Sequence, residues 1–131
     1  MENPVIQVIG LPGSGKTFGI TQWLETKIDN NCVYLNIEDY SQINREQLLI
    51  WDCLNFKKES PVLIESACGV PLDSYIIKLE VPPEVIQVNL NLRSQEPDWD
   101  LFYNYLEPAQ FTPNKIVFNP DELIILLDFL L

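Results

Sequence analysis

The fold is decided by one octapeptide, Gly10-Leu11-Pro12-Gly13-Ser14-Gly15-Lys16-Thr17, which matches the pattern G-x-x-x-x-G-K-[ST] at every fixed position. It directly follows the apolar run Val5–Ile9 and precedes a segment with a helical pattern. Glycines at these positions let the backbone turn its N–H groups inward, where they form a nest for phosphate oxygens. A glycine-rich turn without a ligand is disfavoured because strand, loop and helix occur in the required order.

The residues of this loop, 10–17, would each contribute to binding a nucleoside triphosphate. Lys16 brings a positive charge to the outer phosphates, and the Thr17 hydroxyl is a ligand for Mg²⁺. The helix that begins here directs its positive dipole end at the same phosphates. We therefore expect the nucleotide to contact the following residues: Gly10, Pro12, Gly13, Ser14, Gly15, Lys16, Thr17 and Phe18.

Composition limits both the architecture and the partners. With 131 residues, 47% of them hydrophobic, we expect residues 1–131 to form a single domain. The net charge is −11, and the eight lysines and arginines are scattered along the chain. A nucleic-acid groove requires clustered positive charge, so a nucleic-acid polymer is an unlikely partner. A single nucleotide is still compatible, because the loop gathers its N–H groups locally.

The cysteine and histidine content limits the kinds of site that this chain could form. The three cysteines have no C-x-x-C spacing and histidine is absent, so neither a zinc site nor a disulfide framework is indicated. We interpret each cysteine as a small buried apolar residue. Any proton acceptor must then be a carboxylate or the substrate itself.

No signal peptide precedes Val5, and no apolar run approaches the length of a membrane span. We therefore expect a soluble cytoplasmic protein with no membrane partner.

Short β-branched runs alternate with helical patterns, which predicts an α/β fold built from parallel strands. We expect strands at 5–9, 32–37, 62–64, 75–81 and 116–118, and helices at 16–28, 42–56 and 84–93. Pro82 and Pro83 end the fourth strand, and Asp121 is expected to cap an apolar C-terminal helix. Residues 94–113, here called the flap, contain aromatic and acidic residues but no basic one, with a helical stretch at 98–106.

Three carboxylates stand just after predicted strands, where open parallel sheets place their functional groups. Glu38 and Asp39 follow the second strand and are the leading catalytic candidates, to orient an acceptor hydroxyl and take its proton. The alternative for this pair is a solvated acidic turn. Glu65 ends the third strand, in the position of a magnesium carboxylate, with a helix cap as the alternative.

Arg45 and Arg93 are the only arginines. Because arginine grips phosphate with two parallel hydrogen bonds, both invite a substrate or transition-state role. Arg45 is the candidate for substrate binding, and its alternative is an exposed helix residue paired with Glu46. Five aromatic residues could stack on a base, but packing in the core or the flap is the better explanation: Trp51, Trp99, Phe102, Tyr103 and Tyr105.

The chain resembles the P-loop nucleoside and nucleotide kinase group, which includes small-molecule and polynucleotide kinases. Four stretches carry the resemblance, namely residues 10–17, 34–40, 62–66 and 77–85. The resemblance implies a three-layer P-loop NTPase fold with a five-stranded parallel sheet in the order 2-3-1-4-5, and ATP as phosphoryl donor. It also implies catalytic roles for Lys16, Glu38, Asp39 and Arg93, of which Arg93 falls on the second of two arginines that lead into the lid.

Two departures from the group concern the lid. Asn89 stands where the first lid arginine is expected, and the flap has no lysine or arginine to close over the phosphates. Such an arginine can be worth roughly 10³ to 10⁵ in rate. A slow enzyme, a degenerate relative and an enzyme completed by a protein partner that supplies an arginine are all open.

The sequence therefore leaves two functions to compare. The first is a kinase that uses Mg-ATP to phosphorylate a small hydroxyl or phosphate acceptor. The second is a nucleotide-binding switch or scaffold with little activity, which the bare flap favours. A GTPase is less well supported, because Asn114-Lys115-Ile116-Val117 lacks the aspartate of the base-reading N-K-x-D motif.

Overall fold

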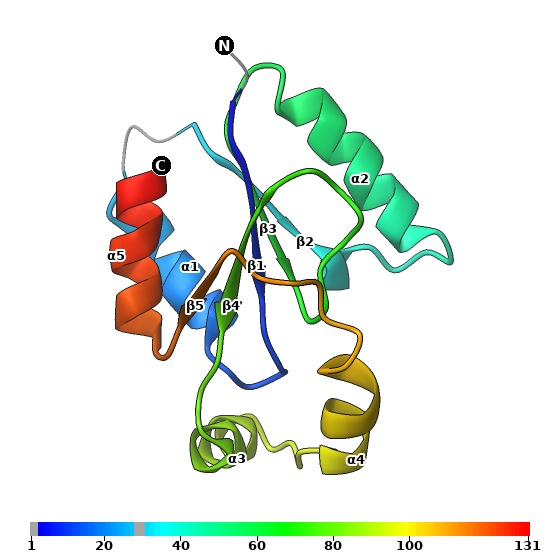
Figure 1. Cartoon of the computed structure of the whole chain (residues 1–131), viewed down its shortest axis with the longest axis vertical. Helices are drawn as coiled ribbons and strands as arrows, with labels where there is room; N and C mark the ends of the chain where they lie inside the picture. The colour runs from blue at the N-terminus through cyan, green and yellow to red at the C-terminus, as the bar shows by residue number, and fades with distance from the viewer. Residues whose placement is uncertain (1–2, 28–30) are drawn as a thin grey trace.

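The computed structural model describes residues 3–27 and 31–131, which form a parallel sheet with helices on both faces (Figure 1). Five strands lie in the order β2-β3-β1-β4-β5, and all four neighbouring pairs are parallel. The strands are β1 (Val5–Ile9), β2 (Val33–Asn36), β3 (Val62–Ser66), β4 (Tyr75–Leu79) and β5 (Lys115–Val117). The predicted α/β class, the parallel sheet and its strand order are confirmed.

The burial of the central strands β1 and β3 explains why the sequence has continuous apolar runs at these positions. Every residue of β1 and β3 is buried, since helices cover both faces of the sheet. Gln7 is the polar exception in β1. Its amide donates to the Val70 carbonyl (3.0 Å) and the Ser74 hydroxyl (2.8 Å), and its oxygen accepts from the Val70 N–H (2.8 Å). This side chain therefore fixes the loop that follows β3.

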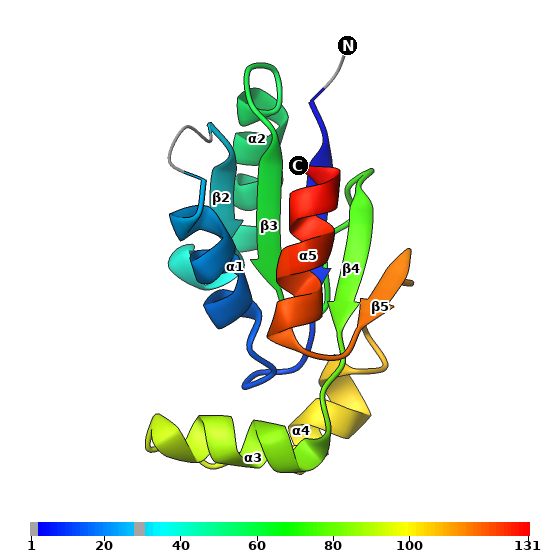
Figure 2. The ribbon, with the colours of Figure 1, turned by 90° about the vertical axis from the view of Figure 1, so that its left-hand side faces the viewer.

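Figure 2 shows the layers from the side, with α1 (Lys16–Glu25) and α5 (Pro120–Leu130) on one face and α2 (Arg45–Phe56) on the other. The α1 and α5 backbones lie close together, because a Cβ on Gly19 would stand 3.0 Å from the Leu123 side chain. The core on this side is formed by buried residues of both helices and the sheet: Ile6, Val8, Ile20, Trp23, Leu63, Ile77, Leu123 and Leu127. The end of the expected first helix, Ile28, lies outside the described residues.

The remaining helices gather beyond the carboxyl ends of the strands, at the bottom of Figure 1. They are α3 (Pro83–Leu92), the single turn α4 (Trp99–Leu101) and the π-helical turn η2 (Phe102–Leu106). Leu11 of the loop packs with Ile86, Leu90 and Phe102 in a separate buried cluster. The helical stretch expected in the flap is thus present, and it is attached to the loop through this cluster.

The C-terminal helix corrects one expectation. Asp121 does not cap it: the Asn119 side chain accepts a hydrogen bond from the Glu122 N–H (2.9 Å), and Pro120 occupies the first turn. Asn119 can do this because its extended backbone places the side chain over the first N–H groups. Asp121 lies in the first turn instead, where the helix dipole favours a carboxylate.

Several boundaries also differ from the sequence prediction: β3 extends to Ser66, β4 ends at Leu79 rather than at residue 81, and α3 and β5 each begin and end one residue earlier. The second helix begins at Arg45 rather than at residue 42, and residues Ile37–Asp39 form a short 3-10 turn, η1. The Asn36 side chain accepts from the Glu38 N–H (2.9 Å), which ends β2 one residue early. Among the helices built from residues 3–27 and 31–131, none is both long and apolar enough to cross a membrane.

Candidate functional site

The loop takes its shape from two glycines in the left-handed region. Gly13 has φ 84° and Gly15 has φ 99°, values that disfavour any side chain. Gly10 differs from the expectation, since its φ is not positive. A glycine is required there because a Cβ would stand 2.7 Å from the Leu79 carbonyl oxygen of β4.

Helix α3 lies directly against this loop. A Cβ on Gly13 would meet the Leu90 side chain at 2.8 Å, and the Asn89 amide donates to the Gly13 carbonyl (2.8 Å). Asn89 occupies the position where the sequence led us to expect an arginine. In this chain the uncharged Asn89 side chain holds the loop in place through this hydrogen bond.

Lys16 is the first residue of α1, and its ammonium is buried beneath the loop. It donates to the Gly10 carbonyl (2.5 Å) and the Leu11 carbonyl (3.1 Å). Burial lowers the pKa of Lys16 to about 8, while the carboxylates of Glu65 and Glu38 oppose this shift and the guanidinium of Arg93 adds to it. The lysine thus lies within electrostatic range of both predicted carboxylate sites and of the predicted lid arginine.

Thr17 and Glu65, the two predicted magnesium ligands, contact each other directly. The Thr17 hydroxyl donates to Glu65 Oε2 at 2.7 Å. Tyr34 donates its hydroxyl to Glu65 Oε1 (2.8 Å), and the Asn36 amide donates to Oε2 (3.2 Å). The buried carboxylate therefore receives three hydrogen bonds, two of them from β2.

Tyr34 and Asn36 are site residues that the sequence analysis did not single out. They are two positions apart on β2, and Asn36 is in register with Glu65 on β3, so all three side chains share one face of the sheet. Burial raises the pKa of Tyr34, with a further contribution from its hydrogen bond to Glu65. The phenol thus stays protonated and acts as a donor. The alternation of polar residues at the end of β2 was the signal for this pair.

The donor chemistry at this point suits Mg²⁺. A hydroxyl and a carboxylate, both oxygen ligands, converge on one place next to the loop. Magnesium is commonly held by one or two such groups together with substrate phosphates and water. Within 3–27 and 31–131, no three carboxylate, thiol or imidazole groups cluster in a way that would hold a metal ion by themselves.

A cleft of about 360 Å³ joins these parts. Its walls come from the loop, from the ends of β2 and β3, and from the segment that follows α3: Pro12, Gly13, Gly15, Lys16, Thr17, Asn36, Glu38, Glu65, Ser66, Ala67, Arg93 and Gln95. Glu38 and Arg93 therefore lie in the same cleft as Lys16, although they are far apart in the sequence. Glu38 is exposed on η1, with its side chain free to reach a ligand.

Five predicted residues lie outside the described lining of the cleft, and the first is Gly10, whose carbonyl accepts from Lys16. Asp39 is exposed and Phe18 is 56% exposed on α1, and neither is among the described residues that line the cleft. Arg45 begins α2, is exposed and also lies outside the lining. Ser14 is buried and faces a different cavity of about 210 Å³, between the loop and the end of β4. Of the predicted carboxylate pair, only Glu38 is brought to the cleft.

Arg93 owes its position to the way α3 ends. Ser94 adopts a left-handed conformation (φ 58°), its N–H donates to the Asn91 carbonyl (3.0 Å), and the Gln95 N–H returns to the Leu90 carbonyl (2.9 Å). This pair of hydrogen bonds is the Schellman termination of a helix. It turns the chain sharply after Arg93, which leaves this side chain and Gln95 on the wall of the cleft.

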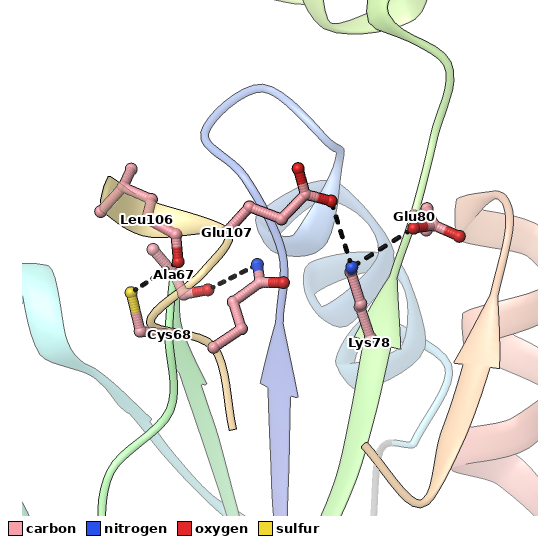
Figure 3. Close-up of polar contacts among 7 residues, drawn as sticks. Ala67, Cys68, Lys78, Glu80, Leu106 and Glu107 are labelled. Carbon is pink, nitrogen blue, oxygen red and sulfur yellow. Dashed lines mark hydrogen bonds and ion pairs between the residues drawn. The ribbon is translucent and has the colours of Figure 1, made fainter. Parts of the chain in front are cut away.

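The far end of the flap is held by the segment that follows β3. The Phe111 N–H donates to the Cys68 carbonyl (2.9 Å), and the Cys68 thiol contacts the Leu106 carbonyl (3.4 Å) (Figure 3). Within the flap, Trp99 stacks on Tyr103 with ring centroids 5.6 Å apart and meets Phe102 edge to face. Packing within the flap therefore accounts for these aromatic residues.

Two solved structures are similar to this arrangement over almost the whole chain. Shikimate kinase from Bacteroides thetaiotaomicron aligns with 97% of this chain and 97% of its own, with a TM-score of 0.63 and 14% identity. Shikimate kinase from Aquifex aeolicus aligns with 95% of each chain, with a TM-score of 0.58 and 16% identity. The chain has the P-loop kinase fold. Its sequence matches no family model and no curated protein.

Proposed function

We propose that this protein is a kinase that binds Mg-ATP at residues 10–17 and transfers the terminal phosphoryl group to a small acceptor. The observation that carries the proposal is the hydrogen bond of 2.7 Å between Thr17 and Glu65. It joins the loop to the end of the neighbouring strand at the point where a magnesium ion and the outer phosphates would lie. The P-loop kinase fold of the solved neighbours supports the same conclusion.

Each charged group of the cleft has a role in this proposal. Lys16 and the N–H groups of the loop hold the phosphates, and Thr17 and Glu65 would hold Mg²⁺, which offsets phosphate charge when bound. Glu38 is placed to accept the proton of the attacking hydroxyl, because it lines the cleft and histidine is absent. Arg93 faces the phosphates from the side of α3.

Tyr34 and Asn36 act through Glu65. Their two hydrogen bonds hold the carboxylate toward Thr17 and occupy lone pairs that would otherwise be buried without a partner. In this role they are positioning residues. The switch or scaffold alternative shares the same nucleotide site, and it differs only in lacking transfer to an acceptor.

The test is to measure Mg-ATP binding by calorimetry in the wild-type chain and in Lys16→Ala. The variant loses a charge-assisted contact and should bind more weakly by roughly 1.5 to 3 kcal/mol. Lys115→Ala is the matched control, since that lysine is exposed on the edge strand β5 and lies outside the described lining of the cleft. Equal affinity in the wild type and Lys16→Ala would contradict the site, and tight binding without any phosphorylated product would favour the switch or scaffold.

A further inference from the structure

The positive charges of this chain can be followed one by one, because it has eight lysines and arginines and no histidine. Six of them lie outside the described lining of the cleft, and one of these is Arg45, which begins α2. Lys27 pairs with Asp128 of α5. Lys57 and Lys58 follow α2 near the start of β1, where the Asn3 amide donates to the Lys57 carbonyl (2.9 Å). Lys115 begins β5, the edge strand of the sheet on the side of β4.

Lys78 lies near the carboxyl end of β4 but is already neutralised. Its ammonium is 3.3 Å from a Glu80 carboxylate oxygen and 3.5 Å from one of Glu107 (Figure 3). Because the Lys78 side chain is only 14% exposed, its charge is balanced mainly by these two carboxylates. Lys78 lines the cavity that Ser14 faces and does not belong to the described lining of the cleft.

Two positive side chains remain in the cleft, and both face the place of the triphosphate. Lys16 is held under the loop, and Arg93 is close enough to influence its pKa. Glu38 and Glu65 line the same cleft, so among the described lining residues the positive and negative side chains balance. The triphosphate of ATP brings more negative charge than one Mg²⁺ ion offsets, so the loaded cleft is negative.

The other polar residues in the described lining carry no charge. They are Thr17, Asn36, Ser66 and Gln95. A phosphate or carboxylate on the acceptor would enter next to Glu38 and the triphosphate without a positive partner, and juxtaposed like charges are strongly unfavourable. A hydroxyl or an ammonium group would be accommodated by the same residues, since carboxylates and amides accept hydrogen bonds.

We infer that the acceptor of the kinase proposed above, on which this inference rests, is an uncharged polyol or an amino alcohol rather than a hydroxy acid or a phosphate ester. The acceptor hydroxyl gives its proton to Glu38, its oxygen forms the new bond to phosphorus, and the bond from phosphorus to the bridging oxygen of ADP breaks. The products are the phosphate ester and ADP. Of the two acceptor classes that the sequence left open, this inference favours the hydroxyl class over the phosphate class.

The test compares acceptors of the same carbon skeleton that differ only in charge. The wild-type chain is supplied with Mg-ATP and with glycerol, aminopropanediol, glycerate or glycerol phosphate, and in a second series with glucose, glucosamine, gluconate or a glucose phosphate. ADP formation above the acceptor-free rate gives kcat/KM for each. The uncharged and amino members should exceed the acidic ones by at least about tenfold.

A charge variant gives a second measurement. Gln95 is exposed on the cleft wall, so Gln95→Arg adds a positive charge there without disturbing the core. The preference for uncharged over acidic acceptors should shrink by about tenfold in this variant. Gln95→Met, which changes the side chain without adding charge, should keep the wild-type preference.

The outcomes separate this inference from the function on which it rests. A higher kcat/KM for the hydroxy acids or phosphate esters overturns the acceptor class and leaves the kinase standing. If that preference disappears in Arg45→Ala, Arg45 supplies the missing charge, and the inference is overturned for that reason. Mg-ATP binding without phosphorylation of any member of the panel overturns the kinase itself and the acceptor class with it.

Discussion

The loop at residues 10–17 and the flap at residues 94–113 both contribute residues to the same cleft, but they differ in charge. The loop has two glycines, Gly13 and Gly15, in left-handed conformations, a buried lysine, and a threonine that is hydrogen-bonded to a carboxylate. The flap has no lysine or arginine, and its first helical turn is acidic. In the proposed kinase, the loop would supply the groups that bind the nucleotide, whereas the flap would add no positive charge to stabilise the transition state.

The largest expected effect concerns the carboxylate that faces both regions. Glu38→Gln should lower turnover by about 10² to 10⁴-fold, because the amide cannot take the acceptor proton. Mg-ATP affinity should change far less. Steady-state kinetics and calorimetry on the same preparation measure both quantities.

Asp39→Asn is the matched control, since Asp39 adjoins Glu38 but lies outside the described lining of the cleft. It should keep most of the activity. Loss of turnover in Asp39→Asn but not in Glu38→Gln would reverse the assignment of the two carboxylates.

Arg93 tests whether the flap side contributes any charge to the reaction. Arg93→Ala should depress turnover by about tenfold or more while the free energy of unfolding changes by less than about 0.5 kcal/mol, because an exposed side chain at a helix end adds little stability. Arg45→Ala removes the other arginine, which lies outside the cleft lining, and serves as the control. Brisk ATP hydrolysis that survives Arg93→Ala would mean that other groups neutralise the phosphates.

The buried charge of the loop predicts a pH dependence. Because the pKa of Lys16 is lowered to about 8, the free protein loses this charge as the pH rises through that value. Phosphate favours the charged form, so Mg-ATP affinity should fall about tenfold between about pH 7 and pH 9. Calorimetry at both pH values measures it.

Lys16→Arg keeps its charge over this range and should show little pH dependence. A pH-dependent loss of folding stability cannot explain the fall in Mg-ATP affinity, because the stability changes with pH in the opposite direction. A lysine whose folded pKa lies below its ordinary 10.5 destabilises the fold below about pH 8, and this cost is relieved as the pH rises toward 10.5. An affinity that is constant from neutral to alkaline pH would contradict a titrating Lys16.

The smallest effect lies at the junction of α3 with the flap. Ser94 holds a left-handed conformation that glycine adopts without strain. Ser94→Gly should raise the free energy of unfolding by up to about 1 kcal/mol, measured by urea denaturation, with Ser94→Ala as the control that keeps the strain. A less stable glycine variant would show that the serine side chain, rather than the turn, holds this junction.

The sequence was sufficient for the parts of the site that are local. The loop pattern fixes its own turns, since Gly13 and Gly15 must adopt φ values that other residues resist. The continuous apolar runs of β1 and β3 identify buried parallel strands, because helices cover both faces of the sheet. Glu65 could be placed because it ends such a strand.

Other features were beyond the sequence because they depend on pairs of residues far apart in it. Asn89 appeared to be a missing arginine, yet it binds the Gly13 carbonyl across 76 positions. Asp121 appeared to be the helix cap, but the backbone at Asn119 gives that role to its neighbour. Glu38 and Asp39 could not be separated by pattern, since adjacent residues on a short turn point in different directions.

By itself, then, the sequence determined the glycine-rich loop, the parallel α/β class and a flap without positive charge. These three follow from short-range chemistry: glycine dihedral angles, apolar periodicity and composition. The strand order came from the resemblance to the P-loop kinases. The tertiary structure alone decided which carboxylate enters the cleft, how Tyr34 and Asn36 hold Glu65, and which positive charges are already taken. These depend on strand register and on the end of α3, which bring together side chains that no local pattern connects.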